Sequence, residues 1–162
     1  MRFDIRQTIA APVDRVLDTL VSPDFYTTLA GVPGVEAPTL RDRQEDGDTV
    51  RLVLGFAFNG SLPSAARAVV DPAKLSWAVD LTVHLNLWTA EFVVVPDHYP
   101  DRLQGSGRHS FDDDGDTTVR VTEGDLVVRI PLLGRKAEGA IVDGFRRYLL
   151  AEGDQLGIQA AG

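Results

Sequence analysis

The chain has 162 residues, of which 44% are hydrophobic and 25% are charged, and its formal net charge is −8. The composition is ordinary for a single globular domain. The negative charge argues against nucleic acids and anionic membranes as partners, because both call for a basic protein surface. The absence of cysteine excludes disulfides, thiol catalysis and thiolate metal ligands. No apolar run reaches the roughly 18 residues of a membrane span. The N-terminus lacks the apolar segment of a signal peptide, so a cytoplasmic protein is expected.

The chain is predicted to begin with one strand and two short helices. Apolar residues alternate with polar ones over 3–9, which is typical of a half-buried strand. Over 13–20 they recur at helical spacing, which predicts a short amphipathic helix. Ser22-Pro23-Asp24 is typical of a helix start and Gly31 of a helix end, so a second short helix is expected between them.

Most of the middle of the chain is predicted to be β-structure. The expected strands are 35–42, 50–58, 66–70, 75–85, 88–95, 103–111 and 117–130. A hairpin turn is expected at 45–48. Gly105 and Gly107 indicate a bulge or a close approach of the backbone in one strand, and Gly124 predicts a bulge in the last. Because sequential antiparallel strands pair with their neighbours, these strands should form a curled sheet.

One long amphipathic helix is predicted from Pro131 to about Gln155, and Gly153 and Gly157 should weaken the chain around its end. At 100° per residue, one face of this helix carries its apolar and small residues. This predicted inner face consists of Leu133, Ala137, Ala140, Ile141, Gly144, Phe145, Tyr148 and Ala151. The expected organisation is a single domain over 1–155 and a short tail over 156–162.

Two segments resemble those of a known superfamily. The first runs from Ile9-Ala10-Ala11-Pro12-Val13-Asp14-Arg15-Val16 to Ser22-Pro23-Asp24-Phe25, and the second is Gly124-Asp125-Leu126-Val127-Val128-Arg129-Ile130-Pro131-Leu132-Leu133-Gly134-Arg135-Lys136-Ala137-Glu138. The whole chain resembles the START-related superfamily, also called SRPBCC or helix-grip, which includes lipid-transfer domains, polyketide cyclases and birch-pollen-allergen-like proteins. The second segment resembles the hallmark of a mostly actinobacterial family without an assigned activity.

The resemblance implies an α+β helix-grip fold. Its parts are a curved antiparallel sheet of about seven to eight strands, two short helices after the first strand, and one long C-terminal helix over the concave face. It also implies a deep, mostly apolar cavity between sheet and helix. Because this fold hosts carriers, enzymes and co-chaperone-like modules, it does not by itself imply one activity.

The small residues on the inner helix face allow two interpretations. They can form the floor of a cavity for an apolar ligand, or they can let the helix approach the sheet closely and fill the core. On the first interpretation the ligand-binding residues are Tyr26, Leu54, Phe56, Trp77, Val79, Leu81, Ile141, Gly144, Phe145 and Tyr148. Phe25, Tyr26 and Leu29 would then lie at the mouth of the cavity.

Catalytic and metal-binding motifs are sparse. His84 and Asp80 share a strand face and could exchange protons, but a solvated face explains them more simply. His98 and His109 have no partner that the sequence suggests. The acidic segment 112–116 is typical of a hairpin turn, since Val121 stands where a calcium loop requires a glutamate. No catalytic residue, metal ligand or cofactor is therefore assigned.

Two glutamates are further polar candidates, and each has a functional and a structural interpretation. Glu123 could point into the cavity if its strand is regular, although a bulge at Gly124 favours a solvent-facing side chain. Glu138 lies near the start of the long helix, where its charge favours the helix dipole.

Three functions are compatible with these features. The leading hypothesis is a non-catalytic binding or carrier domain for a hydrophobic or amphipathic small molecule, such as a lipid, isoprenoid or polyketide. The second is a cyclase or aromatase that uses an acid or base such as Glu123, His84 or Tyr148. The third is a protein-interaction module without a usable cavity. No nucleic-acid partner and no membrane span are expected, and the oligomeric state is left open.

Overall fold

The computed structural model describes residues 1–32 and 34–162. In chain order the elements are β1 (Arg2–Ile9), α1 (Val13–Leu20), the 3₁₀ helix η1 (Pro23–Thr28), β2 (Thr39–Asp46), β3 (Thr49–Ala57), α2 (Ser64–Arg67), the 3₁₀ helix η2 (Pro72–Lys74), β4 (Ser76–His84), β5 (Thr89–Pro96), β6 (Leu103–Asp114), β7 (Thr117–Val128) and α3 (Gly134–Ala161). The strands that these residues form make one seven-stranded sheet in the order β1-β7-β6-β5-β4-β3-β2. Every neighbouring pair in the sheet is antiparallel.

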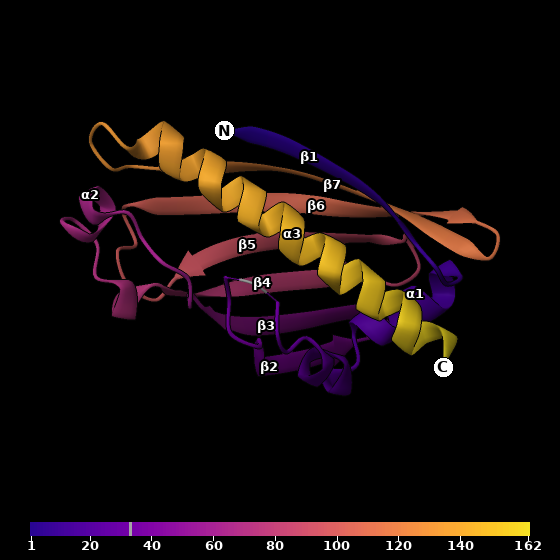
Figure 1. The fold of residues 1–162 in the computed structure, drawn as a ribbon. Helices are drawn as coiled ribbons and strands as arrows, with labels where there is room; N and C mark the ends of the chain where they lie inside the picture. Colours follow the sequence, from indigo (N-terminus) through magenta and orange to yellow (C-terminus); the bar gives the residue numbers. More distant parts are fainter. Residues whose placement is uncertain (33) are drawn as a thin grey trace.

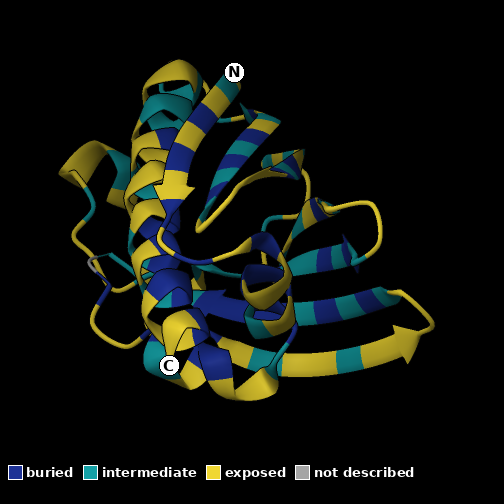
Figure 2. Ribbon diagram, turned by 90° about the vertical axis from the view of Figure 1, so that its right-hand side faces the viewer, coloured by how far each residue is buried: buried dark blue, intermediate teal, exposed yellow. Residues whose placement is uncertain are grey.

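The sheet curves, and α3 lies across its concave face (Figure 1). Buried and exposed residues alternate along most strands, so one face of the sheet carries the core and the other faces solvent (Figure 2). The backbone of α3 approaches α1, β1 and β7 most closely. This is the α+β helix-grip arrangement that the sequence predicts. No helix in the described part of the chain is long and apolar enough to cross a membrane.

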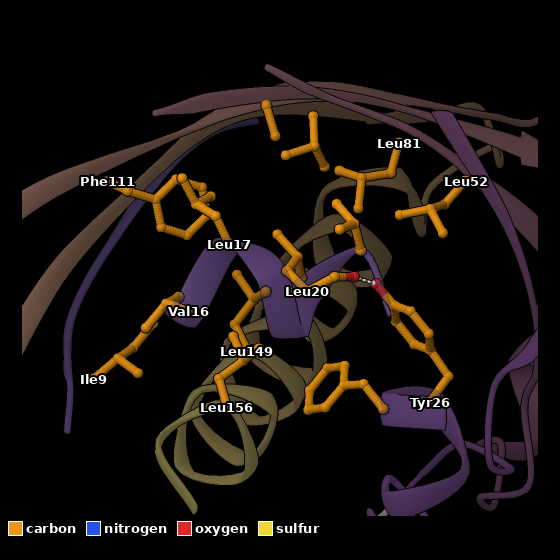
Figure 3. Close-up of a cluster of buried hydrophobic side chains, with 14 of the residues drawn as sticks. Ile9, Val16, Leu17, Leu20, Tyr26, Leu52, Leu81, Phe111, Leu149 and Leu156 are labelled. Atoms are coloured by element: carbon orange, nitrogen blue, oxygen red, sulfur yellow. Dashed lines mark hydrogen bonds between the residues drawn. The ribbon is translucent and has the colours of Figure 1, made fainter. Parts of the chain in front are cut away.

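The centre of the core lies where α1, η1 and the second half of α3 meet the sheet. All four apolar residues of α1 are buried, and this packing stabilises a helix of only eight residues. Ten core residues from the sheet, α1, η1 and α3 are labelled in Figure 3: Ile9, Val16, Leu17, Leu20, Tyr26, Leu52, Leu81, Phe111, Leu149 and Leu156. Full burial of such a side chain contributes about 1.5–3 kcal/mol, so this cluster fixes the C-terminal half of α3 on the sheet.

Two glycines allow aromatic rings to lie directly on the sheet. Gly107 in β6 pairs with Gly124 in β7. A Cβ at Gly107 would overlap the Phe92 ring, and one at Gly124 would overlap the Phe3 ring. The pairing register runs continuously through Gly124, so the predicted bulge is wrong and the close approach of backbone and ring is the reason for the glycine.

The structure also corrects several element boundaries. The segment predicted as a strand over 66–70 is the end of α2 and the turn that follows it, and the strand predicted over 35–42 lies at Thr39–Asp46 instead. The segment after Ser22 is a 3₁₀ helix. The long helix continues to Ala161, well past the predicted end, because its late glycines serve packing. Gly153 leaves room for the Gln7 side chain and Gly157 for the backbone of Ala10.

Candidate ligand-binding site

The predicted ligand-binding residues have three different environments. Five of them are buried: Tyr26, Leu54, Phe56, Leu81 and Tyr148. Trp77, Val79, Gly144 and Phe145 are half-buried. Ile141 is 40% exposed, so its predicted place on the inner face of α3 is wrong.

The inner face of α3 is displaced by about one residue from the predicted one. The residues of α3 that are buried are Val142, Tyr148, Leu149, Glu152, Gly153, Leu156, Gly157 and Ala160. Most of them belong to the second half of the helix. Over 134–147 only Val142 is buried, and it packs in a small second cluster with Leu126 and Val128.

Aromatic rings connect β3 and β4 to the middle of α3. Phe56 stacks on Trp77 with ring centroids 5.9 Å apart, and its ring meets the Tyr148 ring edge-on at 5.3 Å. Leu54 pairs with Val79 two register positions away, on the same face of the sheet. The structure therefore brings together predicted site residues from β3, β4 and α3.

A second aromatic group lies on the same helix, one turn nearer its N-terminus. Phe145 contacts Phe3 at 5.7 Å and Phe92 at 5.6 Å between ring centroids. Tyr26 belongs to the core instead, where its hydroxyl donates to the carbonyl oxygen of Leu20 at 2.6 Å. Phe25 and Leu29 are buried beside it, so these three residues do not lie at an open mouth.

Two surface depressions lie away from this interior. An open depression of about 570 Å³ lies on the edge of the sheet formed by β1, β6 and β7, where Arg2, Asp4, Arg108, Glu123 and Asp125 line it. A smaller one of about 310 Å³ lies between α1, η1 and the end of α3. A ligand cavity between sheet and helix thus stays a prediction. What the structure adds is the half-buried apolar surface of Trp77, Val79 and Phe145 next to the buried core.

A charged cluster is buried where β1, β7 and α3 meet. The Arg120 side chain is fully buried, and its Nη1 donates to Glu152 Oε1 at 2.5 Å. Its Nε and Nη2 donate to Gln7 Oε1 at 3.0 and 2.6 Å, and Nη2 also donates to the carbonyl oxygen of Leu149 at 2.9 Å. Gln7 Nε2 donates to the same carbonyl at 3.0 Å. Because a buried charge is tolerated only when it is paired and hydrogen-bonded, this cluster holds the three elements in one arrangement.

The Tyr148 hydroxyl lies one helical turn before Glu152 and is buried, and no described residue meets it in good hydrogen-bond geometry. Burial raises its pKa well above the usual value, and the negative charge of Glu152 raises it further. Burial likewise raises the pKa of Tyr26, with a smaller contribution from Glu152. Both phenols are therefore protonated at neutral pH, and Tyr148 has a hydroxyl proton to donate.

A buried histidine lies on the same face of the sheet. The His109 ring contacts those of Phe92 and Phe111 in tilted arrangements, and its Nδ1 shares a hydrogen bond of 2.7 Å with Thr122 Oγ1. Burial lowers its pKa well below the usual value, and the positive charge of Arg120 lowers it further. His109 is thus a neutral, structural side chain at neutral pH.

The other polar candidates have structural partners. His84 Nε2 bonds to Glu91 at 2.7 Å rather than to Asp80, which is paired with Arg51. Glu138 accepts a hydrogen bond from the Val128 backbone at 3.2 Å and lies 3.5 Å from the N-terminal amine.

Two acidic side chains lie on the outside of the molecule. Glu123 is exposed, on the outer face of the sheet. Asp113 caps the acidic turn by accepting from the Gly115 backbone at 2.9 Å.

Sequence reasoning missed the buried charged cluster altogether. The available signal was the pattern of β7, in which Thr118, Arg120 and Thr122 alternate with valines. A strand with one polar and one apolar face normally buries the apolar face. In β7 the polar face is buried instead. Only the pairing with a second buried charge on α3 explains the reversal.

Comparisons with known proteins agree with this architecture. The family described as "Protein of unknown function (DUF2505)" matches residues 4–156. No curated protein sequence matches the chain significantly.

Three solved structures share its fold at low sequence identity. The Zhui aromatase/cyclase from Streptomyces sp. R1128 is 16% identical with a TM-score of 0.69, over 99% of this chain and 93% of that one. Norcoclaurine synthase from Thalictrum flavum is 16% identical with a TM-score of 0.61, over 99% and 86%. A START superfamily protein from Mycobacterium smegmatis is 13% identical with a TM-score of 0.54, over 99% and 97%. At these identities the likeness concerns the fold of the START-related superfamily.

Proposed function

The chain belongs to the DUF2505 family and has the helix-grip fold, and from this premise we propose that it binds a hydrophobic or amphipathic small molecule between the sheet and α3. The single observation that carries the proposal is the half-buried apolar surface near the middle of α3. Trp77, Val79 and Phe145 are only half-buried although they pack against the core. Inward-facing apolar surface of this kind is what a ligand with an apolar body would cover.

The uneven fit of α3 supports the same site. Its second half is anchored by the core and by the Arg120–Glu152 pair, whereas its first half buries only Val142. A ligand that enters beside Trp77 therefore displaces little of the packing that stabilises the fold. A lipid, an isoprenoid or a polyketide has the apolar body that this half-buried surface would cover, and the protein would act as its carrier.

Catalysis is the second candidate, and the observation in its favour is the buried group of Tyr148, Glu152 and Arg120 beside the apolar surface. The fold-sharing Zhui protein is named as an aromatase/cyclase. However, Glu152 is engaged by Arg120, and burial raises the pKa of Tyr148. A protonated phenol can orient a ligand but cannot act as a general base at neutral pH, which favours binding over catalysis.

Tryptophan fluorescence offers a direct test, because the chain has only two tryptophans. Trp77 stacks on Phe56 at the start of β4, while Trp88 is 36% exposed in the turn beyond the other end of that strand. In Trp88→Phe, titration with 1-decanol should produce a saturable change in the emission of Trp77. The matched variant Trp77→Phe, which keeps Trp88, should show no saturable change.

Native mass spectrometry of the purified protein complements the titration. A stoichiometric apolar compound, identified after denaturing extraction, would support the proposal and give its chemical class. If nothing co-purifies and neither 1-decanol nor decanoate changes Trp77 emission saturably, the binding function is refuted. A protein-interaction module is then the better description.

A further inference from the structure

The Tyr148 hydroxyl is the polar atom that the fold leaves unsatisfied beside the proposed site. Its surface is buried, and no described residue meets it in good hydrogen-bond geometry. The Glu152 carboxylate lies close enough to interact with it but is already engaged by Arg120. The tyrosine ring contacts Phe56, which in turn stacks on the half-buried Trp77. Buried polar groups in native proteins nearly always have a partner, so an unpaired hydroxyl at this place points to a ligand atom.

The buried arginine nearby does not supply a site for an acid. An arginine in an apolar interior would ordinarily favour a ligand carboxylate, because its planar N–H groups match one. Here all three guanidinium nitrogens of Arg120 already donate to Gln7, Glu152 or the Leu149 carbonyl. A ligand carboxylate would also come close to Glu152, whose charge already balances that of the arginine.

We propose that the ligand has an apolar body carrying an uncharged hydroxyl or carbonyl oxygen, and that the Tyr148 hydroxyl donates a hydrogen bond to this oxygen. The inference rests on the proposed function and names the ligand class for the same site. Alcohols, phenols and ketones fit it, whereas free fatty acids in their ionised form do not. Phe56 and Trp77 would cover the apolar body next to that oxygen.

The test compares two ligands with the same ten-carbon chain, 1-decanol and decanoate, at neutral pH. On the Trp88→Phe background, Trp77 emission should report binding of 1-decanol that is about tenfold tighter than binding of decanoate. Adding Tyr148→Phe should weaken 1-decanol binding by roughly 3–10-fold and leave decanoate binding nearly unchanged. Tyr99→Phe removes a remote hydroxyl, which accepts from the Asp71 backbone, and should change neither affinity.

Two further measurements keep the test independent of folding. Because Tyr148→Phe removes a hydroxyl without a partner among the described residues, its thermal midpoint should equal or exceed that of the parent. The ether 1-methoxydecane keeps the acceptor oxygen but has no proton to donate. It should retain the advantage over decanoate in the unmodified site.

The outcomes separate this inference from the function on which it rests. Equal or tighter binding of decanoate, loss of 1-methoxydecane binding, or an unchanged 1-decanol affinity in Tyr148→Phe would overturn the assignment of the ligand class. In each of those results 1-decanol or decanoate still binds saturably, so the proposed function would stand. If no ligand of the series binds to any variant, the proposed function itself fails.

Discussion

The buried ion pair provides the sharpest prediction for stability. In Arg120→Met, the Glu152 carboxylate stays in the interior with its side chain only 8% exposed and loses its charged partner. The Gln7 amide oxygen loses both of its bonds to the guanidinium in the same variant. Removing one member of a buried pair typically costs about 3–5 kcal/mol, which is a large part of the roughly 5–15 kcal/mol that stabilises a domain.

The double variant Arg120→Met/Glu152→Met tests whether that cost arises from the isolated charge. Because no unpaired charge remains, it should recover most of the loss and lie within about 2 kcal/mol of the parent. The two single variants and the double variant form a cycle with a coupling energy of at least about 2 kcal/mol. Urea unfolding at neutral pH, followed by circular dichroism, measures all four free energies of unfolding.

A surface pair serves as the control. Arg51 and Asp80 form a two-pronged salt bridge on the outer face of the sheet, and Arg51→Met should change the free energy of unfolding far less than Arg120→Met. The reasoning is refuted if Arg120→Met costs less than about 1 kcal/mol or if the double variant is no more stable than Arg120→Met.

Two further predictions concern pH and packing. Because burial lowers the pKa of His109, the unfolded chain takes up a proton below about pH 6.5 before the folded chain does, so stability is complete well above that pH and falls as the pH drops below it. His109→Gln should flatten this part of a urea-midpoint profile, and parallel profiles would contradict the assignment. Gly107→Ala should destabilise by about 1–3 kcal/mol because the new Cβ meets the Glu123 carbonyl and the Phe92 ring. Gly144→Ala, whose Cβ meets nothing closer than 3.8 Å, should instead stabilise by about 0.5–1 kcal/mol in thermal unfolding, and equal effects would contradict the packing argument.

The order of elements could be predicted because each carries its own local signal. The alternation in β3 and β4, the helical spacing of α1 and the long periodic segment of α3 do not depend on the rest of the chain. The fold class follows from that order and from the resemblance to the START-related superfamily. The 66–70 segment was predicted wrongly because a short apolar run alone does not distinguish a strand from a single helical turn.

Side-chain facing could not be predicted where polar groups are buried. Glu152 lies on the inner face of α3, and counting it as polar displaced the predicted face by about one residue. In β7 the two faces are fully reversed, because Arg120 faces the core while Val119 and Val121 lie on the other face. Each of these two charges is tolerated only because the other is present, and the alternation in β7 does not reveal a partner 32 positions away in the sequence.

The charged cluster and the proposed ligand site are two consequences of one packing arrangement. Arg120 binds the carbonyl of Leu149 and the carboxylate of Glu152, so it fixes α3 from that point onward. Gly153 then allows Gln7 to reach the helix, and the close fit continues to Ala160. Before that point the helix carries Phe145 over half-buried apolar surface. Tyr148 lies at the boundary between the anchored half of α3 and its loosely packed half. A ligand bound beside the loosely packed half would therefore place its oxygen next to the Tyr148 hydroxyl.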